Sequence, residues 1–230
     1  IMRCIGCCQG CAANAGKGTP IDCLVNPMLG HEADPSYDLT SVENPKKVLI
    51  AGAGLAGLFA ARAASERGHK VTIYEASNTI GGQWRAAAVP PGKTEYTTLL
   101  YYLNRRMGQL GVEIKLNTPL TRQIVEAEAP DTVVLATGGT PLMPPIKGLN
   151  TSPIVHSAID ILMGRTYFGK NIVVAGGGMV GVETATFLGQ QGSNVTLIEM
   201  TSEIMPDAVA GVKHFLNEHL EKFKVKVYTE

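Results

Sequence analysis

Short apolar runs, glycine-rich turns and amphipathic stretches alternate along most of the chain. Apolar runs at residues 48–51 and 71–74 flank an alanine-rich segment whose apolar positions recur with helical spacing. The same order of strand, glycine turn, helix and strand returns at residues 172–201. Strands that alternate with helices predict an α/β fold, here built from paired three-layer Rossmann-like units.

The segments outside these two units continue the alternation. Apolar residues three and four positions apart predict one helix within residues 92–111 and another over residues 212–223. Apolar runs predict strands at residues 112–116, 131–137 and 225–228. Together these elements extend both Rossmann-like units beyond their first two strands.

Three glycines and one acid in the first unit have the spacing of a dinucleotide-binding turn. Gly52 permits the sharp turn after the strand, Gly54 lets the backbone approach a pyrophosphate, and Gly57 lets helix and strand pack closely. Glu75 ends the second strand, where a carboxylate accepts a hydrogen bond from a ribose 2′-hydroxyl. The alternative is an ordinary glycine-rich turn between a strand and a helix. The predicted contacts on the cofactor are Gly52, Ala53, Gly54, Leu55, Ala56, Gly57 and Glu75.

An internal repeat strengthens this interpretation. Residues 172–201 align on residues 48–77 without a gap, and all three glycines and the acid fall in register. One motif alone is weak evidence, but two in register predict two nucleotide-binding units. The predicted contacts of the second unit are Gly176, Gly178, Gly181 and Glu199.

Two further segments are candidates for cofactor contact. A glycine pair follows the first acid, and the predicted strand at residues 131–137 stops at a Thr-Gly-Gly sequence. A loop with two glycines can pass close to a bound nucleotide. Trp84 in this loop either shields a flavin edge or only packs the loop. The residues assigned to these contacts are Gly82, Gln83, Trp84, Thr137 and Gly138.

All five cysteines lie within the first 23 residues. Cys4, Cys7 and Cys11 are close in sequence and Cys23 is remote, which favours a [4Fe–4S] cluster over zinc, since structural zinc sites usually pair two short hooks. Free or regulatory thiols are a further alternative. Cys8, beside Cys7, is not expected to be a ligand because adjacent cysteines rarely reach one metal.

Composition and charge exclude several classes of function. The 230 residues are 45% hydrophobic and carry a formal net charge of +0, so the sequence has no basic excess for nucleic acid or an anionic membrane. No apolar run approaches the roughly 20 residues that span a bilayer. The N-terminal residues have no signal-peptide pattern, and a cytoplasmic location is predicted.

The patterns divide the chain into three parts. Residues 1–40 form a cysteine-rich segment with a linker, residues 41–165 a first nucleotide-binding domain, and residues 166–230 a second one. A short helix capped near Ser157 is expected to bridge the two domains. The third strand of the second unit has only begun where the sequence stops, so we expect this unit to be truncated and the polypeptide to be longer.

The paired glycine motifs, the first acid, the Gly81-Gly82 loop and the strand end at residues 136–138 resemble those of two-dinucleotide flavoprotein reductases. The cysteine segment, Arg3-Cys-Ile-Gly-Cys-Cys-Gln-Gly-Cys11 with Cys23 following, narrows the resemblance. It is similar to the C-terminal half of the iron–sulfur branch of the Old Yellow Enzyme class, the 2,4-dienoyl-CoA reductase, enoate reductase and trimethylamine dehydrogenase type. Cys8 stands where members usually have another residue.

The resemblance implies an electron relay. It implies FAD in the first unit, a nicotinamide dinucleotide in the second, and a [4Fe–4S] cluster on Cys4, Cys7, Cys11 and Cys23. It also implies an FMN-containing TIM barrel, absent from this chain, that carries the organic substrate. The full-length protein would be an NAD(P)H-dependent flavin oxidoreductase and a possible homo-oligomer.

Three questions stay open at the level of sequence. Glu199 at the end of its strand predicts NADH rather than NADPH, since a carboxylate repels a 2′-phosphate and no Arg follows within three positions. The trimethylamine dehydrogenase type implies an alternative in which the first unit holds only ADP and is not catalytic. The small subunit of glutamate synthase, which also joins cysteines to paired units, is a further alternative.

Overall fold

The computed structural model describes residues 2–149 and 151–230. Its contacts divide into two compact units, each assembled from separate stretches of the chain. The first unit comprises Ile1–Ile5, Asp22–Arg85 and Glu95–Thr140, and the second comprises Gly6–Ile21, Ala86–Thr94 and Pro141–Glu230. Because both units are discontinuous in sequence, the domain boundaries after residues 40 and 165 stay predictions.

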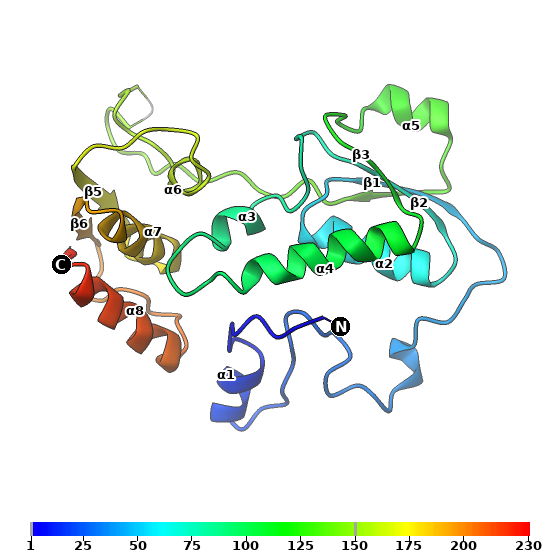
Figure 1. Ribbon diagram of the computed structural model, residues 1–230, viewed down its shortest axis with the longest axis horizontal. Coiled ribbons are helices and arrows are strands. Elements are labelled where there is room, and N and C mark those ends of the chain that lie inside the picture. Colours follow the sequence, from blue (N-terminus) through cyan, green and yellow to red (C-terminus); the bar gives the residue numbers. More distant parts are fainter. Residues whose placement is uncertain (1, 150) are drawn as a thin grey trace. The chain divides into compact units, whose positions relative to one another are not determined.

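A four-stranded parallel sheet forms the centre of the first unit (Figure 1). Its strands lie in the order β3-β2-β1-β4. Leu49 and Ile50 of β1 and Ile73 of β2 have no exposed surface, as expected for parallel strands covered on both faces. The strands are β1 (Lys47–Ala51), β2 (Lys70–Tyr74), β3 (Glu113–Lys115) and β4 (Thr132–Leu135).

The helices of the first unit follow the predicted pattern, with some additions. The helix predicted within residues 92–111 is α4 (Tyr96–Gln109), which buries Leu99, Leu103 and Met107. The glycine turn leads into α2 (Leu55–Glu66). Helix α5 (Arg122–Glu128) was not predicted, because it buries no residue and so has no apolar periodicity. Two short elements are η1 (Pro35–Tyr37) and α3 (Trp84–Ala87).

The second unit repeats the arrangement of the first around a three-stranded parallel sheet in the order β5-β6-β7. Its first two strands pair Asn171 with Asn194, and the first unit pairs Lys47 with Lys70, so the register offset is the same in both. The strands are β5 (Asn171–Ala175), β6 (Asn194–Ile198) and β7 (Lys226–Tyr228). The helices are α1 (Cys11–Gly16), α6 (Ala158–Leu162), α7 (Met179–Gln190) and α8 (Ala210–Lys222).

The core of the second unit lies between its sheet and the helices α7 and α8. Val182 and Leu197 are fully buried in it, and Leu216 and Leu220 contribute from α8. The predicted cap of α6 is confirmed, since the Ser157 hydroxyl accepts from the backbone N–H of Asp160 at 3.1 Å. Within the described residues, no helix is both long enough and apolar enough to cross a membrane. The α/β fold with paired Rossmann-like units is confirmed.

Candidate functional site: two glycine loops and their acids

The glycine loop of the first unit has no room for larger residues at two of its three glycines. Gly52 has φ +104°, and a Cβ there would lie 2.3 Å from the carbonyl oxygen of Ala136. A Cβ on Gly57 would lie 1.9 Å from the carbonyl oxygen of Gly52. A Cβ on Gly54, in contrast, would meet nothing within 4 Å. Gly54 therefore borders open space at the start of α2.

The loop of the second unit has the same geometry. Gly176 has φ +107°, and a Cβ on Gly181 would lie 1.8 Å from the carbonyl oxygen of Gly176. A Cβ on Gly178 would again meet nothing within 4 Å. The repeat seen in sequence is thus a repeat of backbone conformation, with a first glycine at positive φ, an open middle glycine and a third glycine in close contact. The two loops differ at the first glycine, because a Cβ on Gly176, unlike one on Gly52, would meet nothing within 4 Å.

Each open glycine lies at the N-terminus of a helix. Gly54 and Gly178 are the N-caps of α2 and α7, and neither provides a side chain to cap the helix. The first N–H groups of a helix lack partners within it, and the helix dipole adds positive charge there. The two loops therefore fit the diphosphate of a dinucleotide, with open space where it would approach the backbone.

The acid of each unit holds its own glycine loop. One carboxylate oxygen of Glu75 accepts from the backbone N–H of Ala53 at 2.7 Å. The other accepts from the backbone N–H and the hydroxyl of Ser77 at 2.8 and 2.7 Å. Glu75 therefore joins the end of β2 to the residue between the first two glycines.

Glu199 makes the equivalent bonds in the second unit. Its carboxylate accepts from the backbone N–H of Gly177 at 2.6 Å and from the backbone N–H and hydroxyl of Thr201 at 2.9 and 3.1 Å. The sequence interpretation gave both acids a ribose contact and did not include this role in holding the loop. A hydroxyl residue two positions after each acid, Ser77 and Thr201, is the signal that could have indicated it.

The hydrogen bonds to Glu75 lower its pKa below the ordinary value of 4.5. Burial alone would raise this pKa, but the bonds from the N–H groups of Ala53 and Ser77 and from the Ser77 hydroxyl outweigh it. A carboxylate whose pKa is lower in the folded protein contributes stability above pH 4.5. That contribution is lost as the pH falls through the folded pKa.

We expect Glu75→Gln to lower the free energy of unfolding by about 1–2 kcal/mol at pH 7, because a charged hydrogen-bond acceptor is lost. The difference from the native protein should shrink at acid pH, where Glu75 becomes protonated. Denaturant unfolding at pH 7 and at a series of lower pH values, continued below pH 4.5 as far as the protein stays folded, measures this difference. Glu126→Gln, at an exposed pair with Arg122, is the control and should change little. An effect of Glu75→Gln that is independent of pH would contradict this account.

The structure brings the other predicted segments of the first unit to its glycine loop. The backbone N–H of Gly81 donates to the carbonyl oxygen of Ala53 at 2.8 Å, and a Cβ on Gly82 would lie 3.3 Å from the Cα of Gly54. The side-chain amide of Gln83 donates to the carbonyl oxygen of Gly139, just after Thr137 and Gly138. Three segments distant in sequence therefore meet around the open glycine.

Trp84 packs the loop. Its ring stacks on that of Tyr96, with centroids 4.6 Å apart, and its indole N–H donates to the backbone carbonyl of Tyr96 at 2.8 Å. The packing role, one of the two roles considered for Trp84, therefore has direct contacts in the structure.

The predicted cysteine ligands are divided between the two compact units, so the [4Fe–4S] site stays a prediction. Cys4 and Cys23 belong to the first compact unit, and Cys7 and Cys11 belong to the second. None of the five cysteines, all within the described residues, forms a disulfide. Among the described residues, no group of three or more His, Cys, Asp or Glu side chains is placed to hold a metal ion. The four cysteine thiols fit an iron–sulfur cluster by donor chemistry alone.

The second unit contains an ion pair that was not predicted from the sequence. The Lys93 ammonium donates to the carboxylate of Glu183, which lies on α7 and is 7% exposed. A buried carboxylate is stable when it is paired in this way. The two residues are 90 positions apart, and neither belongs to a motif, so no local signal indicated their contact.

Most of the chain matches a known protein family. Residues 46–230 match the family described as Pyridine nucleotide-disulphide oxidoreductase. This range includes both glycine loops, both acids and the Gly81-Gly82 loop.

Individual proteins are similar over a still larger part of the chain. A metal reductase of Desulforamulus reducens is 44% identical over 84% of this chain, which covers 29% of that protein. A cinnamate reductase of Clostridium sporogenes is 40% identical over 89% of this chain, which covers 30% of that protein. A solved structure of 2-naphthoyl-CoA reductase superposes on 98% of this chain with a TM-score of 0.95 and 36% identity, and the chain covers 34% of it.

The chain thus spans about a third of the length of these relatives. Its fold, its paired loops and the match over residues 46–230 agree on one assignment. The chain belongs to the pyridine nucleotide-disulphide oxidoreductase family, and its two units have the Rossmann-like fold of an FAD- and NAD-binding oxidoreductase.

Proposed function

We propose that this chain is the electron-transfer part of an NADH:flavin oxidoreductase of the iron–sulfur branch of the Old Yellow Enzyme class. FAD would bind in the first unit, NADH in the second, and a [4Fe–4S] cluster on Cys4, Cys7, Cys11 and Cys23. Reducing equivalents would leave toward an FMN-containing TIM barrel in another part of the polypeptide. The relatives named above, all reductases and about three times as long, support this proposal.

The observation that carries the proposal is the equivalence of the two glycine loops. Each has a first glycine at positive φ, an open middle glycine, a third glycine in close contact and an acid that holds the loop. Two such loops in one chain indicate two dinucleotides of related shape. In a reductase, the dinucleotide at one loop would donate a hydride and the dinucleotide at the other loop would accept it.

The residues of the chain would bind and orient these cofactors. The N–H groups at the starts of α2 and α7 would bind the diphosphates, and Glu75 and Glu199 would hold the loops while accepting from ribose hydroxyls. Bound flavin supplies the ability to accept a hydride and release electrons one at a time. The space over the nucleotide in the first unit would be limited by Gly82, Gln83 and Thr137 to Gly138. The contacts proposed for the first unit are Gly52, Ala53, Gly54, Leu55, Ala56, Gly57, Glu75, Gly82, Gln83, Trp84, Thr137 and Gly138, and those for the second are Gly176, Gly178, Gly181 and Glu199.

An anaerobic titration with NADH tests the proposal. The chain is first loaded with FAD, and the flavin absorbance near 450 nm is then followed. We expect NADH to bleach this band and NADPH to do so less well, because Glu199 would repel a 2′-phosphate. A chain that takes up ADP but no FAD would instead be a structural nucleotide-binding module, and the proposal would be wrong.

The cluster is tested by metal analysis after anaerobic reconstitution with iron and sulfide. We expect about four iron atoms per chain, because four thiolates can hold a cubane cluster. Cys23→Ser should lose most of this iron. Cys8→Ser is the matched control, since Cys8 is proposed not to be a ligand. Binding of zinc without iron would remove the cluster from the proposal.

The proposal is less specific about the organic substrate and the oligomeric state of the full-length protein. The relatives are named for different substrates, a metal, a cinnamate and a naphthoyl-CoA, although each is at least 36% identical to this chain over the matched residues. Substrate choice is therefore proposed to reside in the barrel outside this chain. A cytoplasmic location and a homo-oligomeric full-length protein complete the proposal.

A further inference from the structure

The outer face of α4 has an unusual composition. Its sequence, Tyr96 to Gln109, contains two Arg and no Lys, Asp or Glu. Exposed helix faces usually carry charges of both signs, as α8 does with Lys213, Glu218 and Lys222. The outer face of α4 therefore has positive charge without a compensating acid on the same helix.

The polar residues of this face form two parallel rows. Thr97, Tyr101 and Arg105 follow one another at intervals of four residues, and Thr98, Tyr102 and Arg106 do the same one position later. Residues four apart lie on the same face of a helix. Each row thus presents a hydroxyl, an aromatic ring and a guanidinium in the same order, and Tyr101 is 71% exposed.

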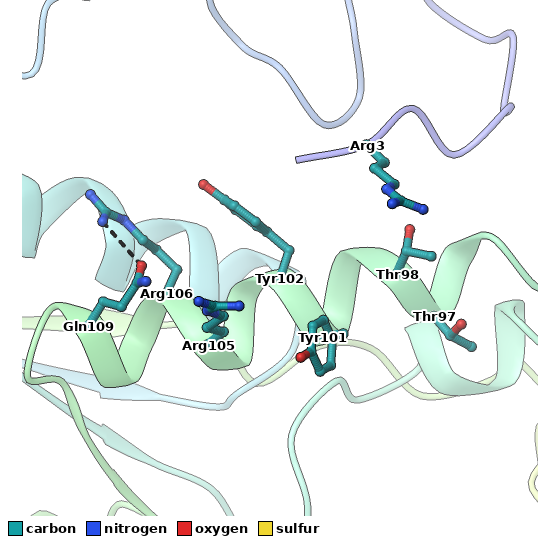
Figure 2. A pocket seen from close by; sticks show the side chains of 8 residues that line it. All are labelled: Arg3, Thr97, Thr98, Tyr101, Tyr102, Arg105, Arg106 and Gln109. Atoms are coloured by element: carbon teal, nitrogen blue, oxygen red, sulfur yellow. Dashed lines mark hydrogen bonds between the residues drawn. The ribbon is translucent and has the colours of Figure 1, made fainter. Parts of the chain in front are cut away.

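A cavity of about 830 Å³ lies against these rows in the first unit. The N-terminal segment passes over α4, and Figure 2 shows the Arg3 side chain reaching toward Thr98, with Tyr102 and Arg106 rising on the same side. Every charged side chain that lines the cavity is an arginine. The cavity therefore combines three guanidinium groups, several hydroxyls and two aromatic rings.

The arginines differ in how they are held. Arg106 donates to Glu66 at 2.9 and 3.0 Å, and Arg62 donates to the same carboxylate oxygen at 2.9 Å. Two arginines thus share one carboxylate, so these three side chains together keep a net positive charge. In the part of the chain that the structure describes, Arg3 and Arg105 are in no ion pair. This local excess of charge stands out in a chain whose formal net charge is +0.

We propose that this cavity is a binding site for a small phosphate ester that carries a planar ring, separate from the two glycine loops. Guanidinium groups bind phosphate through paired hydrogen bonds, and more than one arginine favours a dianion over a single carboxylate. The tyrosine rings offer flat surfaces for a ring of the ligand. The eight residues from Thr98 to Arg105 span about 10 Å along the helix, enough for a ring and a phosphate in one site.

Phenyl phosphate is the probe that tests the site in the 230-residue chain. Titration followed by calorimetry should show saturable binding that is weaker for inorganic phosphate, which lacks the ring, and absent for benzyl alcohol, which lacks the charge. Arg105→Ala should weaken phenyl phosphate binding by about tenfold, because a charged hydrogen-bond donor is lost. Arg3→Ala should act in the same direction.

Arg122→Ala is the matched control, since Arg122 is an exposed arginine on α5 with a side chain that is 90% exposed. It should change the affinity less than twofold, as expected for a distant surface charge. Circular dichroism checks that each variant is folded. Absence of saturable binding, or equal affinities of the native chain and Arg105→Ala, would overturn the proposal. Binding that is lost on substitution of Gly54 and Gly178 but kept in Arg105→Ala would assign the probe to the glycine loops and also overturn it.

Discussion

Gly57→Ala is expected to unfold the first unit, whereas Gly54→Ala is expected to keep the fold and lose the nucleotide. A Cβ on Gly57 would lie 1.9 Å from the carbonyl oxygen of Gly52, and that backbone atom cannot move without opening the loop. We expect a loss of at least about 3 kcal/mol in the free energy of unfolding. A Cβ on Gly54 meets nothing within 4 Å, so its cost without ligand is small.

The same open space is where a diphosphate would approach the backbone. A methyl group on Gly54 would occupy it, and we expect the affinity for FAD to fall by at least about tenfold. Denaturant unfolding and a flavin-binding titration measure the two effects separately. Gly108→Ala in α4 is the control, because its Cβ also meets nothing and alanine favours a helix interior by about 0.5–1 kcal/mol.

Equal losses of stability in Gly54→Ala and Gly57→Ala would contradict the assigned geometry of the loop. Unchanged FAD affinity in a folded Gly54→Ala variant would contradict the proposed position of the diphosphate. The second unit offers an independent repeat of the experiment in Gly178→Ala and Gly181→Ala, where the corresponding distance is 1.8 Å.

Glu199→Arg is expected to reverse the preference for NADH over NADPH. The carboxylate would repel a 2′-phosphate, and a guanidinium would bind it, so the ratio of the two dissociation constants should shift by at least about tenfold. The affinity for both nucleotides should also fall, because the backbone N–H of Gly177 loses the acceptor that it has at 2.6 Å. Binding titrations with NAD⁺ and NADP⁺ give both quantities.

Glu203→Arg is the matched control for this prediction. Glu203 is an exposed acid in the same unit that pairs with Lys213 at 2.9 Å, and its replacement changes the net charge by the same amount. It should leave the ratio unchanged. An equal shift in both variants would mean that overall charge, rather than contact with the ribose, sets the preference.

Much of the fold was predictable because its signals are local. The gapless alignment of residues 172–201 on residues 48–77 fixed the two strand–loop–helix–strand units, and the strand pairings show the same offset in each. The helix α4 was predictable from the spacing of its buried residues. A three-residue strand such as β7 was also predicted, because a short apolar run follows the amphipathic helix that became α8.

The parts that escaped prediction depend on contacts between distant residues. The hydrogen bonds from the Ala53 N–H to Glu75 and from the Gly177 N–H to Glu199 cross 22 positions, and the pair of Lys93 with Glu183 crosses 90. No period or motif marks such contacts. Helix α5 escaped for a different reason, since it buries no side chain and is held by the Thr121 cap at its start.

The central claim is that the chain holds two separate dinucleotide sites of one design. Native mass spectrometry of the chain with FAD and NAD⁺ tests it most directly, because it counts both ligands on the same molecule. We predict one FAD and one NAD⁺ per chain, with Gly54→Ala losing only FAD and Gly178→Ala losing only NAD⁺. A single nucleotide per chain, or loss of both ligands on either substitution, would contradict the claim.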